Sequence, residues 1–204
     1  MKDYNRVRRF MAGSLINSIP VERLRKYRDL ATAEKVDELD MYLWNQKVSL
    51  ALFEDIGNVE VAMRSAKARE MIQEFGIGWF INEEVLDSPA LRSIDAALVN
   101  VKREEHTPQE IHGKLVASLN LGFWVKMLGR GDYLATFDRI TKKRIGSKRR
   151  IFDDLLWKPA ISKTFPGVEP LERSTVDALA RELQFAGNRI AHHEHVIWGV
   201  PAVG

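Results

Sequence analysis

"VDELDMYLWNQKVSLALFEDIGNVEVAMRSAKA", residues 36–68, is the stretch that decides the fold class. It contains no proline and one internal glycine, Gly57. Its apolar residues lie around most of the circumference of a helix, which is typical of a central buried helix or helix pair. We therefore expect this segment to form the core of a helical protein.

Helix starts recur along the rest of the chain, whereas strand signals hardly appear. Ser18 lies two residues before Pro20, Ser88 lies directly before Pro89, and "TPQE" at 107–110 has the pattern of a capping box. We expect Ser88 to cap the helix that opens at Pro89. We expect the helix that starts at 107–110 to continue to Gly129, and a last helix to cover about 174–195. The pattern predicts one all-α domain over residues 1–204.

The composition narrows the class of protein. Of 204 residues, 45% are apolar, the formal net charge is +3 and there is no cysteine. Disulfides and thiolate zinc sites are therefore excluded. The N-terminal segment lacks the apolar core of a signal peptide, and the apolar runs are too short to cross a bilayer. We expect a cytoplasmic protein without a membrane partner.

Positive charge is concentrated in "RITKKRIGSKRR", residues 139–150. Its basic residues are Arg139, Lys142, Lys143, Arg144, Lys148, Arg149 and Arg150. Such density attracts a phosphate backbone without reading sequence, so RNA contact is one interpretation. A solvated surface loop is the other, and no aromatic residue is interleaved to support base stacking.

Three of the five histidines lie in "FAGNRIAHHEH", residues 185–195. On a helix, Asn188 and His192 share a face, with Arg181 before them and His195 one turn further on. A metal site is disfavoured, because "HHEH" is not the zinc-protease pattern and no third ligand source stands out. We therefore expect neither a metal nor another cofactor.

Two interpretations of the histidine cluster remain open. Histidine and arginine near a helix C-terminus stabilise its dipole and cap its carbonyl groups, which would be a structural role. Alternatively, a histidine can exchange a proton with a ribose hydroxyl or a leaving group near neutral pH. An amide and an arginine nearby would then orient and neutralise the phosphate.

Three segments resemble the Abi-like (abortive infection) proteins of the HEPN superfamily. "GNRIAHHEHV" at 187–196 is similar to the family's "RNRIAHHEPV". "YLWNQKVSLALFEDIGNVEVAMRSA" at 42–66 resembles "LYxWNxxLSxAFxxxLxxxEVALRNA". "GKLVASLNLGFWVKML" at 113–128 resembles "GKxVAxLxFGFWxxLL". The segments occur in the family's order and cover most of the chain.

The resemblance implies an all-α HEPN-like helical bundle that forms a homodimer. It implies a metal-independent endoribonuclease of phage defence or a toxin–antitoxin system, with RNA as substrate and an antitoxin protein as a possible partner. An arginine and a histidine spaced R-x4-H would meet their copies at the dimer interface. Cleavage would leave a cyclic phosphate.

By position, His192 matches the motif histidine and Asn188 the motif asparagine. The neighbouring or supporting motif positions are Arg189, His193, Glu194, Glu60 and Arg64. The resemblance makes His192 the acid or base and Asn188 a substrate-positioning group. For Glu60 and Arg64 we expect a structural ion pair.

Gly187 stands where the motif has its arginine. Three explanations are open: a naturally weakened member, a substitution introduced to silence a toxic nuclease, or replacement of the arginine by Arg189 or Arg181. The intact surroundings of the motif favour the second. The rival function is a non-catalytic module that binds RNA, a nucleotide or a protein.

Overall fold

A computed structural model describes residues 14, 17–99, 101, 105–138, 140–166 and 172–196. These residues form two compact units. Unit 1 comprises the described residues up to 55 together with 188–196, and unit 2 comprises those from 56 to 187. The single-domain organisation stays a prediction.

Unit 1 is built from three helical segments. They are α2 (Val21–Glu34), the first part of α3 (Glu38–Phe75) and the last turn of α7 (Arg173–Ala191). Leu24, Tyr27 and Ala31 form the buried stripe of α2 at helical spacing. Lys35 then ends α2 in the left-handed conformation, with φ 55°.

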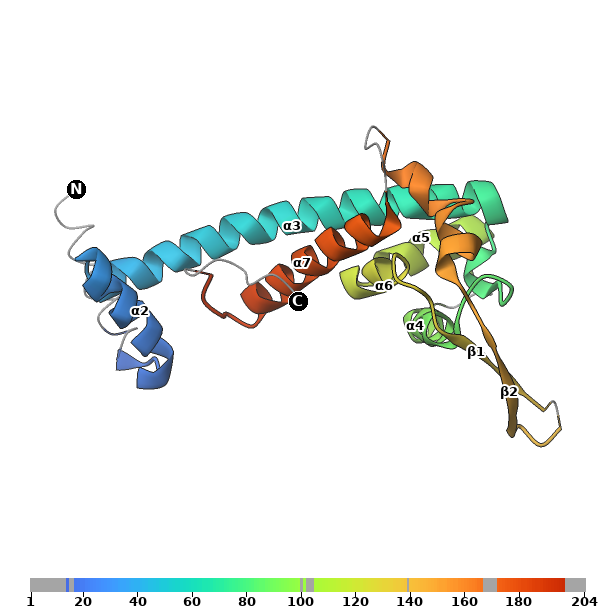
Figure 1. The fold of residues 1–204 in the computed structure, drawn as a ribbon, viewed down its shortest axis with the longest axis horizontal. Helices are drawn as coiled ribbons and strands as arrows, with labels where there is room; N and C mark the ends of the chain where they lie inside the picture. Colours follow the sequence, from blue (N-terminus) through green and yellow to red (C-terminus); the bar gives the residue numbers. More distant parts are fainter. Residues whose placement is uncertain are drawn as a thin grey trace. The chain divides into compact units, whose positions relative to one another are not determined.

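Unit 2 contains the remainder of α3 and α7 and the elements between them (Figure 1). These are η1 (Trp79–Ile81), α4 (Ser88–Leu98), α5 (Pro108–Ser118), α6 (Leu121–Lys126), β1 (Tyr133–Phe137), β2 (Arg144–Arg149), η3 (Asp153–Trp157) and η4 (Ile161–Thr164). The predicted helical class is confirmed, because helices dominate the described residues. The two-stranded sheet is a departure from an all-α fold.

Helix caps agree with the sequence at one position and differ at two. Thr107 and Glu110 form the predicted capping box of α5. The cap of α4 is Asp87, whose carboxylate accepts from Ala90 N at 2.8 Å, and not Ser88. The helix that starts at 107–110, α5, does not continue to Gly129 but ends at Ser118. Asn120 then caps α6 as a new helix by accepting from Phe123 N at 3.0 Å.

Residues 36–68 lie largely within one 38-residue helix, α3, rather than in a helix pair. The expectation that this segment is buried around most of its circumference is wrong. Trp44, Leu50 and Val61 are 51%, 71% and 49% exposed. Residues in the second half of α3, including Ala68 and Met71, are buried in the core of unit 2.

The core of unit 2 combines apolar packing with satisfied polar groups. Trp79 and Trp124 are fully buried, and Trp79 Nε1 donates to His112 Nε2 at 3.1 Å. Lys67 is also fully buried, and its ammonium group donates to the Trp124 carbonyl oxygen at 2.7 Å. Burial lowers the pKa of Lys67 to about 7, although the carboxylate of Asp177 opposes this shift.

Strands β1 and β2 pair antiparallel into a hairpin that extends from the helices of unit 2 (Figure 1). Its base is held by Leu134, which is buried, and by a 2.8 Å hydrogen bond from Ala135 N to Ser88 Oγ. Gly131 enters the hairpin at φ +74°, where a side chain would overlap the Arg150 carbonyl oxygen. Within the described residues, no helix has both the length and the apolarity that a bilayer crossing requires.

We predict that Gly131→Ala lowers the free energy of unfolding by at least about 1–2 kcal/mol, because its backbone is left-handed. The added Cβ would also lie 2.8 Å from the fully buried Phe152 ring. Gly57→Ala is the matched control. Nothing lies within 4 Å of its added Cβ in α3, so stability should rise by about 0.5–1 kcal/mol. Urea denaturation measures both, and equal stability of Gly131→Ala and wild type would contradict this account.

We predict that Lys67 makes stability rise with pH above 7. Its folded pKa is about 7 and its ordinary value is 10.5, so the unfolded chain binds a proton that the folded chain has released between these values. The slope should be about 1.4 kcal/mol per pH unit from this group. Denaturation at pH 7, 8 and 9 should show this extra slope in wild type and not in Lys67→Met. Parallel curves would mean that Lys67 stays charged in the fold.

Candidate functional site

Helix α7 ends at Ala191, four residues before the predicted end, in a Schellman motif. Glu194 N donates to Arg189 O at 2.8 Å, and His193 N donates to Ile190 O at 2.9 Å. His193 takes the left-handed conformation, with φ 55°, that glycine usually supplies. The chain therefore leaves the helix before His195, which does not continue the helical face.

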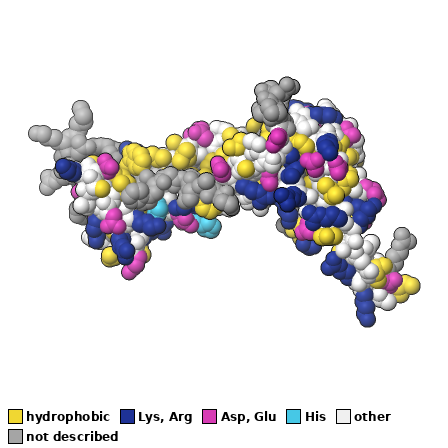
Figure 2. Space-filling view, viewed as in Figure 1, with side chains coloured by type: hydrophobic (Ala, Val, Ile, Leu, Met, Phe, Trp, Pro, Cys, Tyr) yellow, Lys and Arg dark blue, Asp and Glu magenta, His cyan; other side chains and the backbone are white. Residues whose placement is uncertain are grey.

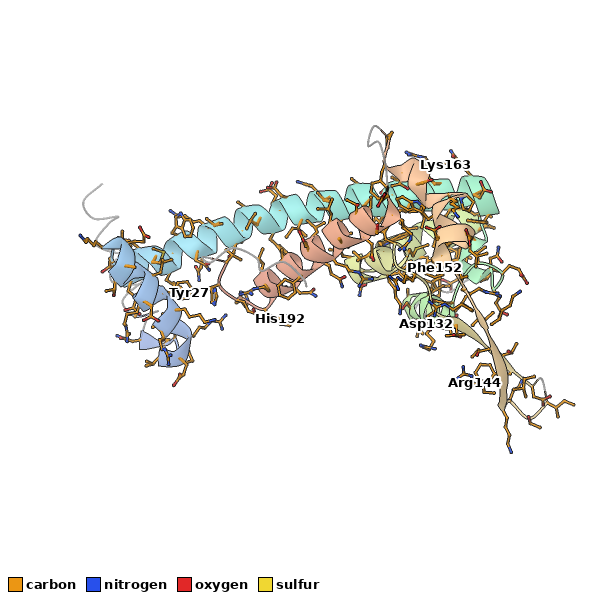
Figure 3. The ribbon with its side chains drawn as sticks, in the orientation of Figure 1. Tyr27, Asp132, Arg144, Phe152, Lys163 and His192 are labelled. Carbon is orange, nitrogen blue, oxygen red and sulfur yellow. The ribbon has the colours of Figure 1, made fainter. Side chains whose placement is uncertain are left out.

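Asn188 and His192 lie one turn apart at this helix end, and both are exposed. His192 N donates to Asn188 O at 3.0 Å. Figure 3 shows His192 at the C-terminal end of α7. Within the described part of the chain, both side chains are therefore accessible to a ligand.

The remaining motif residues close the turn. Arg189 Nε lies 3.3 Å from a Glu194 carboxylate oxygen, and Arg189 also donates to His195 O at 3.0 Å. The ring of His195 packs edge-on against Tyr27, with centroids 6.4 Å apart. Burial, followed by the charges of Lys26 and Arg189, lowers the pKa of His195.

Arg23 from α2 completes the cap of this helix end. Its guanidinium donates to the carbonyl oxygens of His192 and His193. A cation at a helix C-terminus stabilises the carbonyl groups that lack helical partners. Arg23 and Arg189 thus perform the structural role, because they donate to carbonyl oxygens just beyond the end of α7. The side chains of His192 and His193 are exposed instead.

A cavity of about 850 Å³ lies in unit 1 beside this turn. Its lining includes Tyr27, Tyr42, Asn45, Ser49, Phe53 and His193. The Asn45 amide links the walls, because it donates to Tyr27 OH at 3.0 Å and accepts from Val196 N at 2.8 Å. An apolar cavity with a few placed polar groups is typical of a small-molecule or nucleotide subsite.

Gly187 is buried in the part of α7 that belongs to unit 2. A Cβ at this position would lie 3.4 Å from Ile56 Cγ2, which is ordinary van der Waals contact. A side chain can therefore begin there without displacing the backbone of α3. Of the two arginines suggested as replacements, Arg181 is paired with Asp177 at 2.9 Å and Arg189 with Glu194.

Glu60 and Arg64 are half-buried on α3. The expected ion pair between them is absent, since neither forms an ion pair with any residue that the structure describes. Across the described ranges, acidic and histidine side chains nowhere form a group of three that would suit a metal ion.

Comparisons with protein-family models, curated proteins and solved structures found no match to this chain. Any assignment therefore rests on the residues and their geometry.

The basic run lies mostly on the hairpin of unit 2, on β2 and the loop before it. Five of its residues are exposed and share the hairpin, namely Lys142, Lys143, Arg144, Lys148 and Arg149. Arg150 does not join them, because it is 4% exposed and donates to the Glu83 carbonyl oxygen. Arg139 lies outside the described residues. Figure 2 shows the dark-blue basic side chains along this hairpin.

Aromatic residues also belong to this surface, which the linear sequence did not reveal. Strand pairing places Tyr133 opposite Arg149 and Phe137 opposite Arg144. The guanidinium carbon of Arg149 lies 5.1 Å from the centroid of the Tyr133 ring. The run "YLATF", which follows Gly131 and Asp132 and precedes Asp138, carries the aromatic and β-branched residues that signal a strand.

We predict that His193→Gly raises the free energy of unfolding by about 1 kcal/mol, because glycine takes the left-handed conformation without a Cβ penalty. The control is His192→Gly, where φ is not positive and glycine only adds freedom to the unfolded chain. That control should lose about 0.5–1 kcal/mol. Denaturant titration compares the two, and a loss of stability in His193→Gly would refute the proposed cost of its backbone.

Proposed function

We propose that the protein is a metal-independent endoribonuclease of the Abi-like type within the HEPN superfamily, acting in phage defence or a toxin–antitoxin system. The observation that carries this proposal is the pair of exposed side chains, Asn188 and His192, one turn apart at the end of α7. The apolar cavity beside the same turn supports it, because a nucleotide next to the cleaved bond fits a space of this size and lining.

The chemistry follows from the side chains. His192, as the free base, takes the proton from a ribose 2′-hydroxyl, and the 2′-oxygen attacks the adjacent phosphorus. The bond from phosphorus to the 5′-oxygen breaks, and a protonated imidazole returns a proton to that leaving oxygen. A cyclic phosphate and a free 5′-hydroxyl result. The Asn188 amide orients the phosphate by hydrogen bonding.

A homodimer is part of this proposal, with the second imidazole supplied by the partner copy. Its support is the exposed apolar surface of α3, which includes Trp44 and Leu50. The exposed basic residues of the hairpin would attract the RNA backbone by counterion release. An antitoxin partner belongs to the same proposal.

The rival is a non-catalytic binding module, and a specific observation favours it. Position 187 lacks the motif arginine, and the guanidinium groups of Arg181 and Arg189 are both engaged with carboxylates. Neither of these two arginines is therefore available to neutralise the charge that develops on the phosphate. Such a module would bind RNA, a nucleotide or a protein without cleaving it.

We predict that Gly187→Arg protein cleaves RNA in EDTA, and that His192→Ala in the same background lowers the rate by about 10²- to 10⁴-fold. Restoring the arginine should raise the rate of the parent chain by about 10²- to 10³-fold, the size expected of one donor to developing charge. Rates come from single-turnover cleavage of a labelled RNA.

His106→Ala in the Gly187→Arg background is the matched control, because it removes an imidazole that precedes α5 in unit 2 and is not part of the cavity lining. It should retain most of the activity. Binding without cleavage in every variant would favour the non-catalytic module. Cleavage that persists in His192→Ala would exclude the assigned role of this histidine.

A further inference from the structure

One face of the β1–β2 hairpin carries aromatic rings paired with arginines. Opposed residues of an antiparallel pair share a face, and alternate residues of a strand lie on the same side. Tyr133, Ala135 and Phe137 are therefore on one face of β1, with Arg149 opposite Tyr133. The register shifts between Thr136 and Phe137, where Ile145 is the extra residue of a β-bulge, and this shift brings Arg144 opposite Phe137 on the same face. Between these two pairs lies a pair of small residues, Ala135 opposite Ser147.

This aromatic–arginine face is the outward one. Its rings are 48% exposed at Tyr133 and 56% exposed at Phe137. Leu134, which lies on the opposite face, is buried and marks the side on which the base of the hairpin packs against unit 2. This outward face therefore offers both exposed ring surface and positive charge to a ligand.

The charge around these rings is uncompensated within the described chain. Lys142, Lys143, Arg144, Lys148 and Arg149 form no ion pair with any residue that the structure describes. The carboxylate of Asp138, at the end of β1, instead accepts from the backbone N–H groups of Ile140 and Thr141 and from the Thr141 hydroxyl, and that of Asp132 accepts from Tyr133 N. The Asp138 carboxylate is therefore used to shape the loop. Figure 3 places Arg144 on this extending hairpin.

Rings and cations on a single face fit a polyanion whose planar groups are accessible. Single-stranded nucleic acid offers both, because its bases can stack on aromatic side chains while its phosphates contact Lys and Arg. A duplex hides the faces of its bases, and the major groove of duplex RNA is too narrow for side chains to read.

We propose that the aromatic–arginine face binds single-stranded RNA, with bases stacked on Phe137 and Tyr133 and phosphates on Arg144 and Arg149. The two rings are four residues apart on β1, about 13 Å along the strand. That exceeds the 3.4 Å step between stacked bases of one strand, so each ring takes a separate base of an extended strand. This inference rests on the proposed function only for the choice of RNA as the single strand that binds.

The test uses the full chain with His192→Ala, so that no RNA is cut. The probes are a labelled 12-nucleotide RNA and the same RNA annealed to its complement. Fluorescence anisotropy over a salt series, in EDTA, gives the affinity and its salt dependence. Phe137→Ala and Tyr133→Ala should each weaken single-strand binding by about fivefold or more and leave the salt slope unchanged.

Arg144→Gln should weaken binding and also reduce the salt slope, by about 0.7 for one lost phosphate contact. Thr136→Ala on the opposite face is the matched control and should bind as the parent does. Phe137→Leu keeps an apolar residue in the strand while removing the ring, so it should show the same loss as Phe137→Ala. That agreement separates stacking from unpairing of the hairpin.

Duplex binding as tight as single-strand binding would overturn this assignment, and so would full affinity in both ring variants. Loss of affinity in Arg144→Gln but not in the ring variants would reject base stacking and leave only electrostatic attraction of RNA by the hairpin. Cleavage that depends on His192, in a chain whose hairpin binds no RNA, would reject the hairpin site and leave the nuclease. Tight single-strand binding, without cleavage by any chain that contains His192, would keep the hairpin site and reject the nuclease.

Discussion

The buried ammonium of Lys67, 2.7 Å from the carbonyl oxygen of Trp124, is the contact around which unit 2 is arranged. A lysine without solvent must find an acceptor, and this one lies near the C-terminal end of α6. Arg173, the first residue of α7, donates to the Leu128 carbonyl oxygen just beyond α6. Side-chain donors from α3 and α7 therefore converge on carbonyl groups at the end of a short helix, which is where the backbone needs donors.

The same helix end determines where the hairpin leaves the core. The chain passes from α6 through Gly131, whose missing Cβ lets Arg150 and Phe152 approach closely. Arg150 then donates to the Glu83 carbonyl oxygen, so the return strand is anchored as well. An isolated hairpin is marginally stable in water, but this one has both of its ends tied to a packed core. Its outer part can therefore expose polar and aromatic side chains without unfolding.

The sequence predicts the local helix signals well and the tertiary choices poorly. Thr107, Pro108 and Glu110 identify the start of α5, because a capping box is complete within four residues. The sequence does not predict that Asp87, rather than Ser88, caps α4. The Ser88 hydroxyl instead accepts a hydrogen bond from Ala135 N, which is distant in the sequence. The sequence does not predict the hairpin, because β2 ("RIGSKR", Arg144–Arg149) shows no apolar alternation. Its pairing with β1 depends on the long-range contacts that anchor the hairpin.

At the candidate site, helical spacing correctly predicts that Asn188 and His192 are one turn apart, yet it places His195 wrongly. A helix that ends in the left-handed conformation usually has glycine at that position, and here His193 takes it. The sequence therefore carries no glycine signal for the end of α7. The turn separates the three histidines chemically. His195 packs on Tyr27 with a lowered pKa and a buried Nδ1, so it is neutral near pH 7 and part of the fold. His192 and His193 keep exposed side chains, and of these two only His192 shares its helical face with the Asn188 amide, which is why the proposed nuclease assigns proton transfer to His192.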